Sequence, residues 1–412
     1  MTESRYCIYT SPLIVPITAK PIVDGAVVVD NHCIVEVGER DRLLAKWPRA
    51  KTVELSGVLI PPLINCHMHL ELAAFDDMPR PGEGEPMTVW IATLIERRTG
   101  AEDAATTAAR VEKARLEQHH SGVALIGDIS NSSVGVGAGG ESLPEIYRFY
   151  EILAPTTVRT DEALGLLESI STRIPACAHA PYSTAAELIV ALKNRARKNG
   201  HVFSLHVAES IAEIQFLQSG LGPFRDFLDQ RRSWDGTILG GGRFDGSIFY
   251  LDSLGVLDDR TLCVHCVHVS ESEITLLAKR RAKVCLCPGS NDFLRVGHAP
   301  LKKMLDAGLL PAIGTDSPAS NEGGDLWREI GILRHLHPDV PASTLLAMAT
   351  YGGAAALGRT QDYGSLERGK KPLMLEVDVE VDNSATALEV LECLVCGRRP
   401  QNIRWRTPLP RR

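Results

Sequence analysis

The feature that most limits how this chain can fold is a regular alternation of apolar runs with amphipathic stretches after residue 58. Eight runs have the length of strands. They are LIPPLINCH (59–67), GVALIGDI (122–129), YRFYEILAP (147–155), IPACAHAP (174–181), VFSLHVAE (202–209), TLCVHCV (261–267), AKVCLCPGSN (282–291) and LLPAIGTDS (309–317). Strands that alternate with helices indicate βα units and a parallel sheet. Eight such units predict an α/β protein built on a (β/α)8 barrel, the TIM barrel.

A doubly wound sheet is the main alternative, but no Gly-x-Gly-x-x-Gly follows the first run. The 412 residues could form two or three domains, although a barrel commonly uses about 250 or more as one domain. The segment TAAELIVALKNRARKNG predicts a helix, with Thr184 as its N-cap and Gly200 as its stop.

Both ends of the chain have a different pattern from the middle. The first 58 residues read as short strands, and the DN at positions 30–31 fits a hairpin turn. After Gly358 the segment GSLERGKKPLMLEVDVEV is again strand-like. We therefore expect a small β-sandwich domain made of residues 1–58 and 359–412, beside a barrel of residues 59–358.

Two segments interrupt the βα rhythm and are expected at the catalytic end of the barrel as long βα loops. They run from Glu71 to Thr88, which is rich in Pro and Gly, and from Ser233 to Ser247. An ordinary surface loop explains the second segment equally well.

Polar residues fall where the apolar runs end. The first run ends in His67 and leads to His69, and three later runs end near His206, His265 and Asp316. Because i and i+2 share one side of a strand, and because all carboxyl ends of barrel strands surround one mouth, these side chains should converge. Three histidines and a carboxylate suit a catalytic zinc ion, with Fe(II) as the alternative.

At these positions the chain resembles the amidohydrolase superfamily, in its single-metal deaminase and chlorohydrolase branch. The matching segments are NCHMHLEL, HAPYS, SLHVAES, VHCVHVS, CPGSN and GTDSPASN, in the order of the family. One departure lies near the end, where ERGKKPLMLEVDV stands in place of the usual Gly-Lys-x-Ala-Asp segment and its strand.

The resemblance implies roles for the converging residues. It makes His67, His69, His206 and Asp316 ligands of one divalent metal ion, because ACAHAP offers no lysine to bridge two ions. It makes Glu209 the proton shuttle and His265 the residue that orients or deprotonates the attacking water, while Asp316 accepts a proton. His268 competes with His265, but an odd offset in a strand points it away from the mouth.

The resemblance also implies a substrate class. Relatives use a histidine like His179 near a ribose, Glu71 could accept hydrogen bonds from sugar hydroxyls, and Trp90 could stack on a base or pack on the barrel. The segments are most similar to deaminases of aminodeoxyfutalosine, an adenine nucleoside of menaquinone synthesis. We expect a hydrolytic deaminase of an aminated purine nucleoside. The rivals are an s-triazine chloro- or aminohydrolase and, outside enzymes, a non-catalytic metal-binding barrel.

We expect the binding partner to be a small-molecule substrate rather than a nucleic acid or a membrane. The net charge of −7, without basic clusters, argues against nucleic acid. The sequence contains no run of 18 or more apolar residues that could span a membrane. The start MTESRYCIYTS lacks the pattern of a signal peptide, so we expect a cytoplasmic location. The choice between a monomer and a homodimer stays open. Of the ten cysteines, Cys263, Cys266, Cys285 and Cys287 could form a zinc cluster, but poor spacing favours buried thiols.

Overall fold

The computed structural model describes residues 5–100, 104–131, 144–379 and 385–407. All eight predicted runs contain a strand that belongs to a parallel sheet. The strands are β6 (Leu63–Met68), β7 (Val123–Ser130), β8 (Glu145–Ile152), β9 (Ala176–Ala178), β10 (Phe203–Val207), β11 (Thr261–His265), β12 (Lys283–Leu286) and β13 (Ala312–Ile313). The predicted α/β class with parallel strands is therefore confirmed.

The eight strands form two parallel sheets whose edges meet, in the orders β6-β7-β8-β9 and β10-β11-β12-β13. One seam is made by the His206 N–H, which donates to the His179 carbonyl at 2.8 Å. The other seam is a parallel bridge between Met68 and Asp316. These seams join the sheets into the arrangement of a (β/α)8 barrel, and both lie at residues that the sequence singles out.

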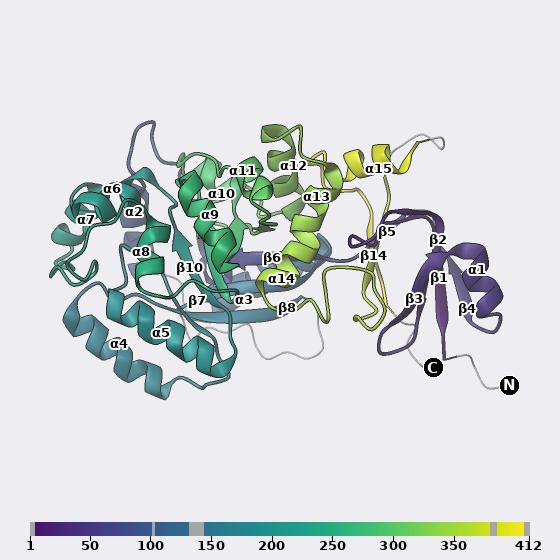
Figure 1. The fold of residues 1–412 in the computed structure, drawn as a ribbon, viewed down its shortest axis with the longest axis horizontal. Coiled ribbons are helices and arrows are strands. Elements are labelled where there is room, and N and C mark those ends of the chain that lie inside the picture. Colours follow the sequence, from purple (N-terminus) through teal and green to yellow (C-terminus); the bar gives the residue numbers. More distant parts are fainter. Residues whose placement is uncertain (1–4, 101–103, 132–143, 380–384, 408–412) are drawn as a thin grey trace.

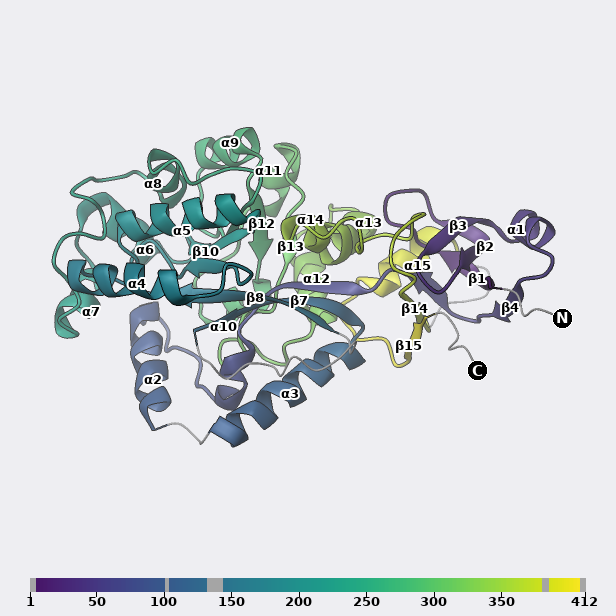
Figure 2. The ribbon, with the colours of Figure 1, turned by 90° about the horizontal axis from the view of Figure 1, so that it is seen from below.

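Helices cover the outside of the barrel, with α4 and α5 on one side and α2 and α3 on another (Figures 1 and 2). Their bounds are α2 (Met87–Thr99), α3 (Ala104–His120), α4 (Thr157–Ser169), α5 (Ala186–Asn199), α6 (Ile211–Ser219), α7 (Pro223–Gln230), α8 (Ser247–Ser253), α9 (Glu271–Arg280), α10 (Pro288–Phe293), α11 (Leu301–Asp306), α12 (Leu326–Leu336), α13 (Ala342–Ala347), α14 (Gly353–Ala356) and α15 (Ala387–Leu394). The 3-10 helix η1 spans Leu70–Phe75, and the π-helix η2 spans Met348–Gly352. None of the helices in the described ranges combines the length and apolar character that crossing a bilayer requires.

The predicted limits of α5 are right at one end only. Gly200 ends the helix in the left-handed conformation, with φ 68°, which glycine adopts at little cost. The N-cap is Ala185 rather than Thr184. Thr184 is wrong as a cap because its hydroxyl instead donates to the Ile152 carbonyl on the neighbouring strand, at 3.4 Å.

Strands from both chain ends form one further sheet, at the opposite end of the molecule from α4 and α5 (Figure 1). Its order is β15-β14-β5-β1-β2-β3, and β4 also pairs with β1. The bounds are β1 (Cys7–Ile14), β2 (Ile22–Val29), β3 (Ile34–Glu39), β4 (Lys51–Glu54), β5 (Val58–Ile60), β14 (Met374–Val377) and β15 (Ile403–Arg406), with α1 (Arg40–Lys46) beside them. The predicted hairpin joins β2 to β3, where Asp30 accepts from the backbone of His32 and Cys33.

The pairing of β14 with β5 brings the two chain ends into this sheet. The strands pair as one sheet, so the two layers of the expected β-sandwich are not established, and the division at residues 58 and 359 stays a prediction. The last two residues of the predicted run GSLERGKKPLMLEVDVEV lie outside the described residues.

The two segments that interrupt the βα rhythm follow different kinds of element. Residues 71–88 do follow the first barrel strand, and the Arg80 side chain ties them to the Asp292 carbonyl at 2.8 Å. Residues 233–247 follow α6 and α7 rather than a strand, so they are not a direct βα loop as expected.

The four cysteines considered for a zinc cluster are free and buried in the hydrophobic core. Among the described residues, the groups with the spacing of metal ligands contain none of them.

Candidate active site

The strand ends bring the predicted histidines and Asp316 into one buried cluster. The ring of His67 lies 5.0 Å from that of His69 and 4.9 Å from that of His206, centroid to centroid. The His265 ring lies 5.2 Å from that of His206. Asp316 is fixed to the first strand through its backbone, because its N–H donates to the His67 carbonyl at 3.0 Å. Residues from strands β6, β10 and β11 and from the segment after β13 therefore meet, as expected for the mouth of a barrel.

The donor atoms of this cluster have the spacing of a metal site. Asp316 Oδ1 lies 3.4 Å from His67 Nε2 and 3.5 Å from His69 Nε2. Tetrahedral ligands with bonds of about 2.1 Å are separated by roughly 3.4 Å. Within the described part of the chain, neither ring nitrogen of His67 has a hydrogen-bond partner, nor does His206 Nε2. Since buried polar atoms are normally paired, these nitrogens fit a divalent metal ion.

The cluster also favours the protonation states that a metal requires. Burial lowers the pKa of His67 and His206, and it lowers that of His69 to about 4, with a contribution from His67. Burial alone would raise the pKa of Asp316, but the surrounding histidines hold it well below its ordinary value. Neutral imidazoles and an ionised carboxylate are the forms that bind metal ions.

Two hydroxyl groups donate hydrogen bonds to the Asp316 carboxylate. Ser290 Oγ donates to Asp316 Oδ2 at 2.6 Å, and Ser320 Oγ donates to the same oxygen at 2.8 Å. Because both bind Oδ2, the other oxygen, Oδ1, stays directed at the histidines. Hydrogen bonds of this kind orient metal ligands.

A chain of hydrogen bonds sets the tautomers of His265 and His206. Asn291 Oδ1, an acceptor, lies 2.9 Å from His265 Nδ1, so that nitrogen carries the proton. His265 Nε2 is then an acceptor, and it lies 3.0 Å from His206 Nδ1, which donates to it. This leaves the lone pair of His206 on Nε2, the nitrogen without a partner.

Glu209 lies beside His265 at the edge of this cluster. Its Oε1 is 3.6 Å from His265 Nε2, and the residue is buried. Glu213 accepts from the backbone N–H groups of Ala208 and Glu209, which fixes the turn after β10. Burial raises the pKa of Glu209 above its ordinary value, while His265 acts against this and Asp316 adds to it.

His268 lies apart from the cluster. Its Nε2 is 2.7 Å from the carbonyl oxygen of Val296, to which it donates. That side chain is therefore engaged with the backbone of the segment that follows α10.

The three candidate substrate-binding residues have different surroundings. The His179 ring lies 5.0 Å from that of His206, and its Nδ1 is 2.6 Å from Ser183 Oγ. Glu71 is already engaged: Arg98 contacts Oε1 at 3.2 Å, while Ser130 Oγ donates to Oε2 at 2.8 Å. Trp90 is buried in the hydrophobic core.

Sequence reasoning missed Glu151, the fifth residue of the run YRFYEILAP. It is 5% exposed, and its Oε1 lies 3.7 Å from His206 Nε2 without any hydrogen-bond partner. Burial, together with Glu71 and Asp316, raises its pKa to about 8. The only indication in the sequence is that Glu151 is a carboxylate near the end of an apolar strand run. Ser290 and Asn291, within the matching segment CPGSN, were also passed over.

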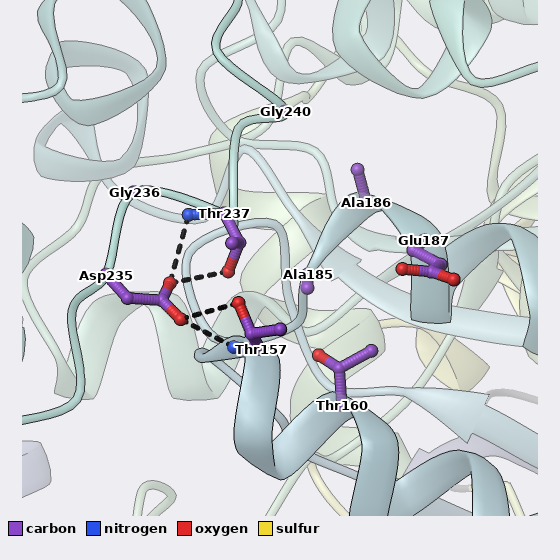
Figure 3. Close-up of a pocket in the computed structure, with 9 residues that line it drawn as sticks. All are labelled: Thr157, Thr160, Ala185, Ala186, Glu187, Asp235, Gly236, Thr237 and Gly240. Atoms are coloured by element: carbon purple, nitrogen blue, oxygen red, sulfur yellow. Dashed lines mark hydrogen bonds between the residues drawn. The ribbon is translucent and has the colours of Figure 1, made fainter.

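A cavity at the starts of α4 and α5 is also lined by Asp235, Gly236, Thr237 and Gly240 (Figure 3). The cavity measures about 510 Å³. Asp235 closes the start of α4 by accepting from the N–H and the hydroxyl of Thr157. The segment after α7 is thus tied to the side of the barrel where β8 and β9 end.

The fold and the site define a hydrolase built on a barrel. The chain belongs to the amidohydrolase family, which residues 58–396 match. Enzymes of this family bind a divalent metal ion, and the histidine and carboxylate cluster fits one. Residues 25–50 also match an imidazolonepropionase-like composite domain of bacteria.

Curated relatives are deaminases. A 5-methylthioadenosine/S-adenosylhomocysteine deaminase of Pelotomaculum thermopropionicum is 28% identical over 390 residues, which cover 86% of this chain and 80% of the relative. An aminodeoxyfutalosine deaminase of Deinococcus radiodurans is 27% identical over 376 residues, covering 84% of each chain. The expectation of a hydrolytic enzyme that acts on a C–N bond is confirmed.

Solved structures share the fold. Helicobacter pylori aminofutalosine deaminase with methylthio-coformycin superposes with a TM-score of 0.80 at 24% identity, covering 96% of this chain and 98% of the other. A triazine hydrolase variant superposes with a TM-score of 0.73 at 20% identity, covering 95% and 91%.

Proposed function

We propose that this enzyme hydrolyses the amino group from the purine ring of an adenosine-type nucleoside, releasing ammonia, with aminodeoxyfutalosine as the first candidate substrate. The observation that carries the proposal is the single buried cluster in which four histidine and carboxylate donors adjoin Glu209 and His265. Relatives named as deaminases of adenosine derivatives, at 27–28% identity, support the substrate class.

We assign His67, His69, His206 and Asp316 to hold one divalent ion, zinc first and iron as the alternative. When bound, such an ion activates a water nucleophile at neutral pH. An adenosine deaminase of Xanthomonas campestris with bound zinc shares the fold, with a TM-score of 0.73 at 24% identity, which is compatible with zinc.

The remaining residues move and hold protons. Glu209 would protonate the ring nitrogen beside the carbon under attack, and the protonated form that burial favours is the one this task needs. His265, with its Nδ1–H held by Asn291, would orient the attacking water through Nε2 in exchange for the His206 Nδ1–H that Nε2 accepts in this structure. Asp316 would accept the proton of that water and return it to the departing amine.

The substrate class is tested by measuring ammonia release as kcat/KM over a panel of nucleosides, free adenine, cytosine and melamine, with chloride release from a chlorotriazine. We expect adenine nucleosides to exceed the free bases by roughly 100-fold or more, because two unpaired polar groups cost about 1–3 kcal/mol each. Nucleosides with a large 5′ substituent should exceed adenosine. A free base or a chlorotriazine as the best substrate would refute the nucleoside assignment and leave the hydrolase intact.

A further inference from the structure

One buried group at the mouth has no role in the chemistry above. In the part of the chain that the structure describes, the only fully buried carboxyl oxygen without a hydrogen-bond partner is Oε1 of Glu151. Glu71, which the sequence suggested for the sugar, has both oxygens engaged by Arg98, Ser130 and the backbone of Asn131. An unpaired oxygen at this position points to a missing donor, since buried polar atoms are normally satisfied.

Glu151 lies beside His179 in the barrel wall. Glu151 is on β8, opposite Cys177 of β9, and His179 follows β9 directly. Donor atoms of Glu151, His179 and His206 lie within 4.8 Å of one another. Ser183 engages Nδ1 of His179 at 2.6 Å, which leaves Nε2 for a ligand. A carboxyl oxygen and an imidazole nitrogen can each form a hydrogen bond with a hydroxyl group, so neighbouring side chains of these types suit two neighbouring hydroxyls.

A second metal ion is the competing occupant of this position. It would need a nitrogen from His206, but His206 Nδ1 is bound to His265 at 3.0 Å, and only Nε2 remains. If Nε2 binds the ion held with His67, His69 and Asp316, a second ion would keep only Glu151 and His179. Two protein ligands are fewer than the three or four that such sites use.

We propose that Glu151 accepts a hydrogen bond from a sugar hydroxyl of the nucleoside beside His179, which the family resemblance already places near the ribose, and that Glu151 thereby selects ribonucleosides; this rests on the proposed function. One hydroxyl donates to Glu151 Oε1, and its neighbour pairs with His179 Nε2. Glu151 accepts through Oε1 whether or not its other oxygen carries a proton.

The test compares Glu151→Met with the wild type on adenosine, 2′-deoxyadenosine and 3′-deoxyadenosine. Methionine keeps approximately the size of the side chain but removes the acceptor oxygen. For adenosine we expect kcat/KM to fall at least tenfold, mainly through KM, and the loss to shrink for the analogue that lacks the contacted hydroxyl. Metal content should stay at the wild-type level, and calorimetry should show weaker binding of inosine. Glu168→Met, the same exchange at an exposed position on α4, serves as the matched control.

Three results would overturn the proposal: unchanged kcat/KM, an equal loss on all three nucleosides, or loss of the metal ion, which would make Glu151 a ligand. His179→Asn tests the same pair from its other member and should give the same dependence on the hydroxyls, even if Glu151→Met does not fold. Wild-type ammonia release from nucleosides tests the proposed function itself, so the two failures remain distinguishable.

Discussion

At the scale of single residues, Glu209 separates chemistry from metal binding. Its carboxyl group lies beside His265 Nε2, but its burial and raised pKa suit a proton donor rather than an ionised ligand. Glu209→Gln should keep the full metal content and lower kcat by roughly 100-fold or more, because the amide cannot donate a proton as an acid does. Metal analysis and steady-state kinetics on one preparation check this. Activity within a few-fold of the wild type would assign the protonation to another group.

The metal ligands should behave in the opposite way. His67→Ala or Asp316→Ala removes one of four donors, so metal and activity should be lost together. Elemental analysis of each purified variant gives the metal content, and His268→Ala is the matched control because that ring contacts the Val296 carbonyl. A full metal complement in both variants would show that these residues are not the ligands.

The histidines could be foreseen because strand parity and strand ends fix where such side chains point. His67 and His69 share one side of a strand, and the barrel places all strand ends at one mouth. Glu151 could not be foreseen in the same way. Whether a lone carboxylate in an apolar run is paired or free depends on its neighbours in space, and Asp128, which also lies in such a run, accepts from the Leu70 N–H.

At the scale of elements, the short helix α10 positions two groups of the site at once. It begins with Pro288, directly after β12, and carries Ser290 to Asp316 and Asn291 to His265. Two hydroxyls donate to Asp316 Oδ2, whereas Asn291 is the hydrogen-bond partner of His265 Nδ1. The two side chains of α10 should therefore differ in importance.

We expect Asn291→Ala to lower kcat by about tenfold with little change in KM, because His265 loses the acceptor that fixes its tautomer. Ser290→Ala should cost much less, since Ser320 still donates to Asp316. The separation of kcat from KM in both variants is the informative measurement, because loss of the His265 orientation affects the chemical step only for Asn291→Ala. Equal effects of the two substitutions would contradict this account of α10.

The start of a helix could be predicted where residues close together in the sequence form its cap. Ser270 caps α9 through a capping box with Glu273, a pattern visible in the sequence. Thr184 has the right residue type for a cap but is drawn to the carbonyl of a neighbouring strand. The expected position of residues 233–247 is wrong because two short helices, α6 and α7 with 9 and 8 residues, lie between them and the strand run VFSLHVAE. The sequence pattern does not distinguish these helices from the loop.

At the scale of the whole molecule, Glu376 joins distant parts of the chain in the terminal sheet. This buried carboxylate on β14 accepts from the backbone of Ser56 and Gly57, just before β5, and from Arg404 and Arg406 of β15. Burial alone would raise its pKa, but these partners lower it to about 2. Such long-range pairing cannot be read from one segment, since the partners are some 320 residues apart.

The lowered pKa makes a prediction about acid stability. Because the folded pKa of about 2 lies below the ordinary value of 4.5, the contribution of Glu376 is complete above pH 4.5 and is lost as the pH falls towards 2. Glu376→Gln should therefore lower the free energy of unfolding at pH 7 by about 1–3 kcal/mol, and its difference from the wild type should shrink between pH 4.5 and 3. Urea unfolding at several pH values measures this, with Glu54→Gln, whose exposed carboxylate pairs with Arg40, as the control. A difference that stays constant with pH would mean that the charge of Glu376 does not hold the sheet together.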